Sequence, residues 1–423
     1  MAMQQVSEPD STLEHLIGVP VEQLQSGMYV AALDRPWIET PFMLEGLLLQ
    51  ETKDLQALRH FCKKVYVDPS RSSPEAVRRL RTLSVPSRSQ ASSAPATPRL
   101  VYPIKRTVEQ EFSHSRGDYQ EAKQMVHRLL RDEQNWHRNL PDVKHMVGRF
   151  ADSILSNPSA LNWLARIKHE SEYTAEHCLN VGVVAMIFGR HLGFERSQIE
   201  ELGLAGMLHD VGKMKLDQTI LNKPGKLTEE EFAHIKTHVL EGYAMLKDEQ
   251  LSLTIKEACR DHHERLNGTG YPSGKRQEEI DCTARIIAIV DTYDAITSDR
   301  VYGPARPTAE ALDILYKLRC THYDEELVIR FIECIGIYPP GSIVELHNGM
   351  IAVVLSVEPN KRLKPKILVM LDEDKNPIHQ TTLDLADPKV FDDKRLNIKK
   401  VLPPGSYNIH LEGLMERLLQ PTA

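Results

Sequence analysis

The sequence predicts a mainly α-helical protein with a small α+β domain at its N-terminus and a β-rich extension at its C-terminus. Three observations support this prediction. Apolar residues recur at helical spacing over 105–338, short apolar runs around turn residues occur within 1–68, and GSIVELHNGMIAVVLSVEP and PKILVMLD, within 339–423, are typical of strands. With 423 residues, the chain has room for about two to four domains.

The N-terminal part, residues 1–68, is expected to be a small regulatory or oligomerisation domain. In VPVEQLQSGMYVAAL, short apolar stretches surround a Ser26–Gly27 turn, which indicates strands. Residues 53–62, KDLQALRHFC, suit a helix, and KVYVD suits another strand. Residues 69–104 are rich in Ser, Pro, Ala and Arg and poor in large apolar residues, which predicts a flexible linker.

Two capping-box patterns mark helix starts within 105–338. Ser197 with Glu200 predicts a helix that runs into Leu208. Thr228 with Glu231 predicts a helix that runs to about Leu246. In the C-terminal extension, the Asn-Gly pair at 348–349 predicts a hairpin turn between two strands.

Charge, cysteine content and hydropathy restrict which partners the chain can bind and in which compartment we expect it. The net charge of −7 argues against binding nucleic-acid polymers through a general basic surface. The six cysteines form no CxxC pair, which is typical of reduced thiols rather than a disulfide framework or a zinc ribbon. The N-terminus is polar, and apolar runs such as Ile286–Val290 are far shorter than the roughly 18 residues of a membrane span. A cytoplasmic location without a membrane span is therefore expected.

Several side chains that can bind metal occur at the ends or apolar faces of the predicted helices. Residues 262–272 read HHERLNGTGYP, in which adjacent histidines precede a glycine-containing loop. Asp291 interrupts the apolar run IIAIVDTYDAI, where a buried carboxylate without a partner would be costly. A His-Asp pair at an exposed helix end, or an aspartate turned outward, is weak support when taken alone. The combined candidates are His177, His209, Asp210, His238, His262, His263 and Asp291.

Imidazoles and carboxylates together suit borderline divalent metals such as Fe, Mn, Co or Ni. The candidates are too many for one tetrahedral site, and they suit two octahedral ions with Asp210 as the bridge. Two ions a few ångströms apart can hold a bridging hydroxide at neutral pH and stabilise phosphoryl oxygens. The pattern therefore indicates phosphoester hydrolysis at a binuclear metal centre.

The order of these motifs resembles the HD-GYP family of the HD phosphohydrolase superfamily. The matching segments are EYTAEHCLNV at 172–181, LHDVGKMKL at 208–216, ILNKPGKLTEEEFAHIKTHVLEG at 220–242, DHHERLNGTGYP at 261–272 and IVDTYDAITSDR at 289–300. The resemblance covers about 105–340 and implies an HD-domain helical bundle. It also implies metal-dependent hydrolysis of the bacterial second messenger cyclic di-GMP to linear pGpG, and often on to GMP, which lowers messenger levels that control biofilm and motility. The pattern LQSGMYV, PWIETPF and CKKVYVD resembles a small N-terminal domain of unassigned role that often precedes this family's catalytic unit.

The resemblance also implies roles for individual residues. The seven candidates would be the metal ligands, and Asp210 and Lys213 would be catalytic, with Lys213 close to the scissile phosphate. The substrate contacts would be Lys213, Gly270, Tyr271, Pro272 and Arg300. Further partners to consider are a second copy of the chain and signalling proteins that contact the Gly-Tyr-Pro loop.

The sequence departs from the family pattern at a few positions. Some members bind a third metal through a glutamate four residues before the first histidine, where this chain has Tyr173. Glu176, adjacent to His177, is not well placed by the helical period, so we expect two ions rather than three. The other departures are Asn267 for the usual Asp, Val301 for a common Pro and Gly303 for a common basic residue.

Three functions compete on these residues. The first is an active cyclic di-GMP phosphodiesterase. The second is an HD phosphohydrolase that acts on other nucleotides or phosphomonoesters, against which the Gly-Tyr-Pro loop weighs. The third is a catalytically weak sensor that binds the messenger and acts through partners, against which the complete ligand set weighs.

Overall fold

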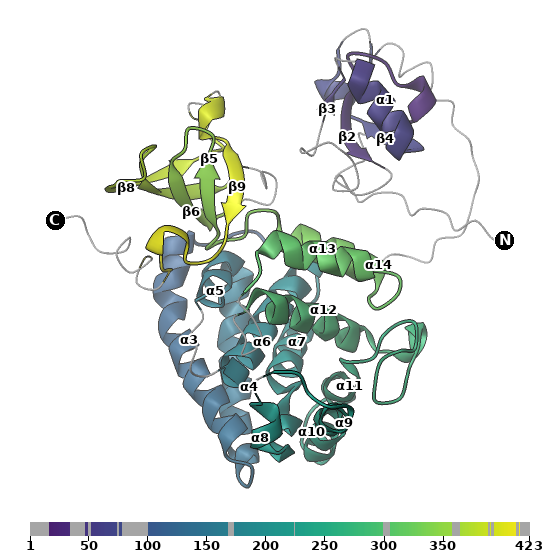
Figure 1. The fold of residues 1–423 in the computed structure, drawn as a ribbon, viewed down its shortest axis with the longest axis vertical. Helices are drawn as coiled ribbons and strands as arrows, with labels where there is room; N and C mark the ends of the chain where they lie inside the picture. The colour runs from purple at the N-terminus through teal and green to yellow at the C-terminus, as the bar shows by residue number, and fades with distance from the viewer. Residues whose placement is uncertain are drawn as a thin grey trace. The chain divides into compact units, whose positions relative to one another are not determined.

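The chain forms two compact units, Met1–Thr97 and Pro98–Ala423, in a computed structural model (Figure 1). The division falls within the stretch predicted as a linker, most of which lies outside the described residues. The structure describes residues 17–33, 47–49, 52–73, 76–77, 100–167, 173–223, 225–298, 305–357, 364–387, 390, 393–411 and 414.

The described part of the N-terminal unit contains an antiparallel sheet with the strand order β1-β4-β2-β3 and the helix α1. Its main elements are β1 (Ile17–Pro20), β2 (Tyr29–Leu33), β3 (Leu47–Leu48), α1 (Thr52–Phe61) and β4 (Lys64–Val67). Gly27 has a φ of +86°, which confirms the predicted turn before β2. Val30, Leu58 and Val65 are fully buried in a core that belongs to this unit alone.

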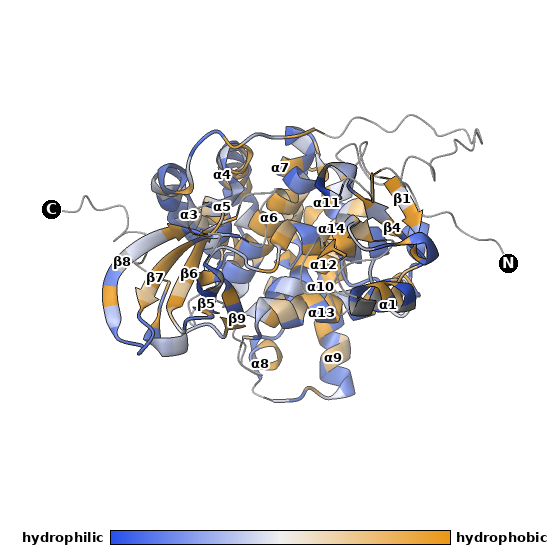
Figure 2. Cartoon of the chain, turned by 90° about the horizontal axis from the view of Figure 1, so that it is seen from above, coloured by the Kyte–Doolittle hydropathy of each residue, from blue (hydrophilic) through white to orange (hydrophobic). Residues whose placement is uncertain are grey.

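The second unit is a helical bundle with a sheet at its C-terminal end. Its helices are α3 (Val108–Arg131), α4 (Trp136–Ser156), α5 (Pro158–Leu164), α6 (Tyr173–Leu192), α7 (Arg196–Leu208), α8 (Gln218–Leu221), α9 (Glu229–Lys236), α10 (His238–Leu246), α11 (Leu253–Asp261), α12 (Cys282–Thr297), α13 (Thr308–Leu318) and α14 (Glu325–Ile335). Figure 2 shows hydrophobic residues concentrated on α6 and α12 in the interior of the bundle. Residues 175–189 of α6 are buried without interruption, as expected for a helix that is surrounded on all sides.

Glycines bring the central helices unusually close together. A Cβ atom added at Gly206 of α7 would lie 2.6 Å from the backbone of Gly182 in α6. A Cβ atom added at Gly212, in the 3-10 helix η5 (Val211–Lys215), would lie 2.0 Å from the carbonyl oxygen of His238. Because real Cβ atoms cannot approach so closely, glycine is required at both crossings. The crossings place the ends of α6, α7, η5 and α10 next to one another.

Two predicted helix boundaries need correction. The helix predicted to open at Ser197 begins at Arg196, and its first turn is closed by Gln198 Oε1, which accepts from the Glu195 amide at 2.9 Å. The predicted partner of Ser197, Glu200, instead pairs with Arg196 four residues earlier.

The helix predicted from Thr228 starts there with the expected capping box. It is interrupted at Thr237, however, so α9 and α10 are separate helices. The Thr237 amide donates to the carbonyls of His234 and Ile235, and this tightened turn ends α9. The interruption leaves His238 at the first position of α10, where it faces η5.

The C-terminal sheet is antiparallel with the strand order β8-β7-β6-β5-β9. Its strands are β5 (Ile343–Leu346), β6 (Ile351–Ser356), β7 (Lys366–Leu371), β8 (Pro377–Asp384) and β9 (Ile398–Leu402). The predicted hairpin turn is confirmed, with Gly349 at a φ of +93° between β5 and β6. One face of the sheet, including Ile343 and Val353, joins the core of the bundle, and the other face, including Val344 and Val354, has its own core.

Among the described residues, no helix has the length and apolar character needed to cross a membrane.

Candidate metal centre

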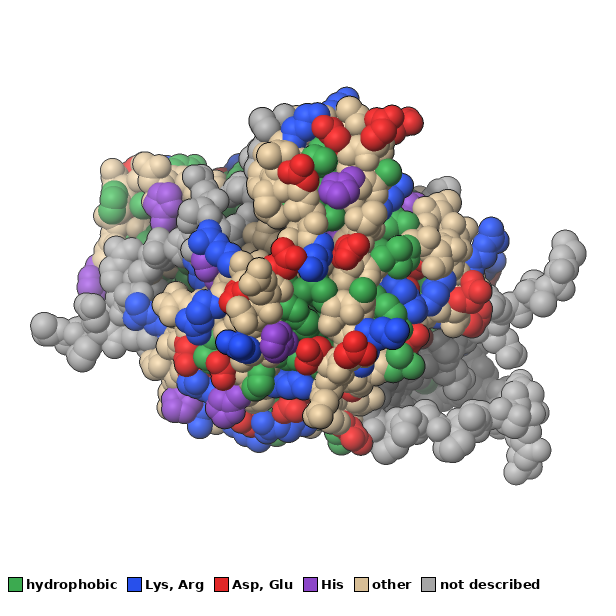
Figure 3. Space-filling view, turned by 90° about the horizontal axis from the view of Figure 1, so that it is seen from below, with side chains coloured by type: hydrophobic (Ala, Val, Ile, Leu, Met, Phe, Trp, Pro, Cys, Tyr) green, Lys and Arg blue, Asp and Glu red, His purple; other side chains and the backbone are tan. Residues whose placement is uncertain are grey.

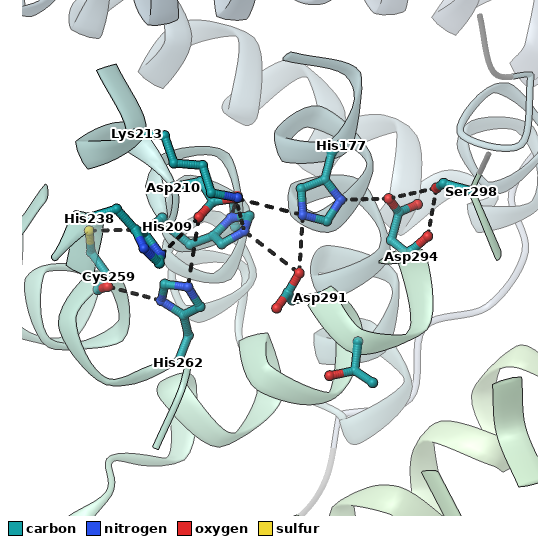
Figure 4. A network of polar contacts seen from close by, with 12 residues as sticks. His177, His209, Asp210, Lys213, His238, Cys259, His262, Asp291, Asp294 and Ser298 are labelled. Atoms are coloured by element: carbon teal, nitrogen blue, oxygen red, sulfur yellow. Dashed lines mark hydrogen bonds and ion pairs between the residues drawn. The ribbon is translucent and has the colours of Figure 1, made fainter. Parts of the chain in front are cut away.

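All seven predicted ligands meet at one place in the bundle, where several helices end, and Figure 4 labels each of them except His263. His177 lies in the first turns of α6, His209 follows α7, and Asp210 precedes η5. His238 is the first residue of α10, and His262 and His263 follow α11. Asp291 lies inside α12. These residues come from segments far apart in the sequence, so the tertiary fold is what gathers them.

The first ligand group consists of His177, His209 and Asp291, whose ligand atoms lie within 4.8 Å of one another. The Nε2 atom of His177 is 3.1 Å from Asp291 Oδ1, and that of His209 is 4.0 Å from the same oxygen. All three side chains are buried. The group can therefore hold a cation between two imidazoles and one carboxylate.

The second ligand group consists of His238, His262 and His263, which meet the same distance limit together with Asp210. The rings of His262 and His263 have centroids 4.1 Å apart, and those of His238 and His263 are 5.2 Å apart. This group offers three imidazoles and no carboxylate of its own.

Asp210 lies between the two ligand groups and faces each with a different oxygen. Its Oδ2 is 3.2 Å from His209 Nε2 and 3.8 Å from His177 Nε2. Its Oδ1 is 3.2 Å from His238 Nε2 and 3.9 Å from His262 Nε2. This orientation suits a carboxylate that bridges two cations.

Several buried polar atoms at this centre lack a hydrogen-bond partner among the described residues. They are the Nε2 atoms of His209, His238 and His262 and the Oδ1 atom of Asp210. Buried polar atoms are nearly always satisfied, so such a cluster needs an explanation. Imidazole nitrogens and carboxylate oxygens aimed at a shared point fit divalent metal ions.

The second nitrogen of each of these histidines is held by an oxygen that can only accept a hydrogen bond. The Nδ1 atom of His209 donates to the Gly206 carbonyl at 2.6 Å, and that of His238 donates to the Ile235 carbonyl at 2.7 Å. His262 Nδ1 donates to the Cys259 carbonyl at 2.9 Å. Because Nδ1 carries the proton, the lone pair of the neutral ring is on Nε2, which faces the centre.

His177 differs because a carboxylate holds its outer nitrogen. Its Nδ1 atom lies 2.7 Å from Asp294 Oδ2, and Ser298 Oγ donates to the same oxygen at 3.1 Å. Asp294 therefore orients the His177 ring from the side away from the other ligands.

The pKa values of the ionisable side chains differ sharply across the metal centre. Although burial disfavours its charged form, hydrogen bonds with Asp291 and Asp294 raise the pKa of His177 to about 9. Burial lowers the pKa of His263 to about 3, so its ring is neutral at physiological pH. Despite burial, the charge of Lys213 holds the pKa of Asp210 well below its usual value. Burial also lowers the pKa of His262 well below its usual value, so the centre offers an ionised carboxylate at Asp210 and neutral rings at His262 and His263.

Two neighbouring residues are poor ligand candidates. Cys178 lies close to His209 and Asp210, but burial and nearby carboxylates raise the pKa of its thiol well above the usual value. The carboxylate of Glu176 forms an ion pair with Lys123 of α3. The Lys123 ammonium group would compete with a metal ion for that carboxylate.

The centre lines a cleft of about 800 Å³. Lys213 reaches into it with Nζ 2.5 Å from Asp210 Oδ2. Phe232, Ile235 and Tyr271 line another part of its wall, and the Tyr271 ring stacks on His263 with centroids 4.7 Å apart. The cleft therefore combines a cation beside the metal centre with an aromatic and apolar wall.

The Gly-Tyr-Pro loop is held by a residue to which the sequence analysis gave no role. Glu264 is 2% exposed, and its two carboxylate oxygens accept from the amides of Ser273 at 2.7 Å and Lys275 at 2.9 Å. A Cβ atom added at Gly270 would lie 2.5 Å from the Cα atom of Glu264. The signal was present in the sequence, because Glu264 directly follows the two histidines.

The remaining predicted substrate contacts divide into two sets. Tyr271 is among the described residues that line the cleft, whereas Gly270 and Pro272 are not among them. Arg300, Val301 and Gly303 lie outside the described residues.

On the face in Figure 3, Lys and Arg side chains are interspersed with Asp and Glu rather than forming one extended basic area.

Comparison with known proteins assigns three parts of the chain. Residues 154–327 match the HD domain, residues 16–135 match a domain of unknown function (DUF3391), and residues 343–409 match a KOW domain associated with HD domains. The first of these contains all seven candidate ligands. The KOW match identifies the C-terminal sheet, for which the sequence analysis predicted only strands.

Curated relatives and a solved structure resemble the chain over different lengths. Cyclic di-GMP phosphodiesterase PA4108 of Pseudomonas aeruginosa is 36% identical over 87% of this chain and 88% of its own length. The 3′3′-cGAMP-specific phosphodiesterase 3 of Vibrio cholerae is 34% identical over 40% of this chain and 37% of its own. An HD-GYP-type protein from Bdellovibrio bacteriovorus, Bd1817, aligns with a TM-score of 0.45 and 17% identity, covering 75% of this chain and 98% of its own. From the match to the HD domain and the relative similar over most of both chains, we conclude that this chain belongs to the HD-GYP family of HD-domain phosphohydrolases.

Proposed function

We propose that this protein hydrolyses a phosphodiester bond of cyclic di-GMP to give linear pGpG, and that a second cleavage gives GMP. The observation that carries the proposal is the position of Asp210 between two ligand groups, beside Lys213 in a cleft of about 800 Å³. The name and the near full-length similarity of the Pseudomonas relative support the same substrate. Such an activity would lower the level of the messenger.

Two divalent ions, drawn from Fe, Mn, Co and Ni, would occupy the centre. His177, His209 and Asp291 would hold one ion, His238, His262 and His263 the other, and Asp210 both. When bound, such ions activate water and neutralise charge on phosphoryl oxygens. The proposed number follows from the two separate ligand groups on either side of Asp210.

The chain's own residues would position the substrate and orient the ligands. The Lys213 ammonium beside Asp210 would attract a phosphate group and stabilise the charge that develops on it. Asp294 holds the His177 ring in one orientation. The wall formed by Phe232, Ile235 and Tyr271 would contact a base, since aromatic and apolar side chains present flat surfaces for stacking.

A second candidate is hydrolysis of a related cyclic dinucleotide. This candidate is favoured by the similarity to proteins named 3′3′-cGAMP-specific phosphodiesterases. A third candidate function is that of a sensor, in which the cleft binds the messenger without hydrolysing it. A homodimer and signalling partners at the Gly-Tyr-Pro loop remain predictions.

Metal-loaded protein incubated with cyclic di-GMP, 3′3′-cGAMP and a chromogenic phosphodiester distinguishes these functions. We expect cyclic di-GMP to be consumed fastest, with pGpG and then GMP resolved by chromatography. Asp210→Ala should abolish turnover and leave the melting temperature close to that of the parent, whereas Asp248→Ala, at an exposed position, should change neither. Faster turnover of 3′3′-cGAMP would favour the second candidate, and binding without any turnover would favour the sensor.

A further inference from the structure

A second cavity lies between the helical bundle and the C-terminal sheet. Its volume is about 370 Å³, and its walls come from α5, α12, α13, β5 and β9. Figure 1 shows the sheet at the end of the bundle near α5. This cavity is separate from the cleft at the metal centre, with which it shares no lining residue.

Helix α12 divides the two spaces. Its residues Asp291, Thr292, Ala295 and Ile296 line the cleft, and Tyr293, Asp294 and Thr297 line the cavity. The alternation follows the helical period, so opposite faces of one helix serve the two spaces. Helix α12 is therefore a wall shared by the two spaces.

The cavity contains an arginine without a carboxylate partner among the described residues. Arg166 is half-buried, and its Nη1 donates to the Thr308 hydroxyl at 3.2 Å and the Tyr293 hydroxyl at 3.4 Å. Its Nε atom is buried and has no hydrogen-bond partner within the described part of the chain. Because withdrawing a guanidinium from water is costly without a counter-ion, this arrangement favours an anion in the cavity.

Two further features supply hydrogen-bond donors. Ser342 is 2% exposed and lines the cavity, and its hydroxyl has no partner among the described residues. Thr308, at the start of the 11-residue helix α13, also lines the cavity, and a helix N-terminus carries partial positive charge. The one carboxylate among the described lining residues, Asp294, already accepts from His177 and Ser298.

We propose that this cavity binds a small organic phosphate of up to mononucleotide size, with its phosphate on Arg166 and Ser342. A planar guanidinium, a hydroxyl and a helix N-terminus together match the several oxygens of a phosphate group. Ile343, Val401 and Leu402 offer apolar surface to the rest of the ligand. The volume lies near the lower end of the range for small-molecule sites, roughly 300–1,000 Å³.

The test is calorimetric titration of the metal-free, full-length chain with inorganic phosphate, GMP and guanosine. We expect phosphate and GMP to bind and guanosine not to bind. Arg166→Gln should weaken GMP binding about tenfold or more, because a charge-assisted hydrogen bond is lost. Ser342→Ala should weaken GMP binding several-fold. This smaller change tests the proposal if the arginine variant fails to fold.

Two matched variants locate the binding site. Arg149→Gln alters an arginine that pairs with Asp118 and Glu121 away from the cavity, so its GMP affinity should equal that of the parent. Lys213→Gln alters the cleft and should leave GMP binding at the cavity intact. The proposal would be overturned if only the Lys213 variant lost GMP binding, or if all variants bound GMP equally. It would also be overturned if neither phosphate nor GMP bound to the parent, or if guanosine bound as tightly as GMP.

Discussion

The two ligand groups of the metal centre differ in charge and in what holds their histidines. The first group contains Asp291, and a second carboxylate, Asp294, lies behind His177. The second group contains imidazoles alone, and backbone carbonyls hold the rings of His238 and His262. Asp210 faces both groups, with one carboxylate oxygen toward each. An ion in the first group would therefore meet more negative charge, and we expect it to be held more tightly than an ion in the second.

The largest effect should come from breaking one group at a time. His177→Ala and His262→Ala should each reduce the metal content from two ions per chain to one and lower turnover by about 1,000-fold or more, since both ions act on the same phosphate. The His262 variant should keep the ion that is harder to remove with a chelator. Elemental analysis and product chromatography check both results. Two tightly bound ions in either variant would contradict the division into two groups.

A smaller effect should follow from changing the support behind the first group. Asp294→Asn keeps the shape of the side chain but replaces a charged acceptor for His177 Nδ1 with a neutral one. Loss of such a contact typically costs about 10- to 100-fold in metal affinity or activity. Metal titration should show weaker binding of one ion and unchanged binding of the other.

Ser298→Ala is the matched control for that change, because it removes another partner of Asp294 and leaves the carboxylate in place. Its metal affinity should lie much closer to the parent value. Equal weakening of both ions by Asp294→Asn would mean that the groups are not independent.

The smallest effect should come from the support beside the second group. In Glu264→Gln, the side-chain NH2 group would replace one of the two oxygens that accept hydrogen bonds from the backbone amides of Ser273 and Lys275. One backbone amide would then lose its acceptor, and such a loss destabilises the loop by roughly 1–3 kcal/mol. Because the loop carries Tyr271, which stacks on His263, we expect the KM for cyclic di-GMP to rise several-fold with two ions still bound. Steady-state kinetics with elemental analysis separates this result from metal loss. A fall in kcat at unchanged KM would assign Glu264 to the metal centre instead.

Motif order carried most of the information about the site. His177, His209, His238 and Asp291 are separated by up to about a hundred residues, and spacing alone offers no distances between them. Their chemistry nevertheless restricts the outcome, because buried imidazoles and carboxylates require partners or metal. The predicted helix boundaries were less accurate. Glu200 pairs with Arg196 instead of capping the helix at Ser197, and the helix that starts at Thr228 is interrupted at Thr237. Both outcomes depend on local competition among hydrogen bonds.

The sequence by itself determined the mainly helical class, the flanking α+β and β-rich regions and the identity of the residues that gather at the centre. Only the tertiary structure decided that each oxygen of Asp210 faces a different ligand group and that Glu264 holds the Gly-Tyr-Pro loop. It also decided that Arg166 and Ser342 both line a second cavity. The physical reason is that residue type and periodicity fix which side chains are buried or reactive. Distances between them depend on how closely helices cross, which here rests on glycine contacts such as Gly182 with Gly206.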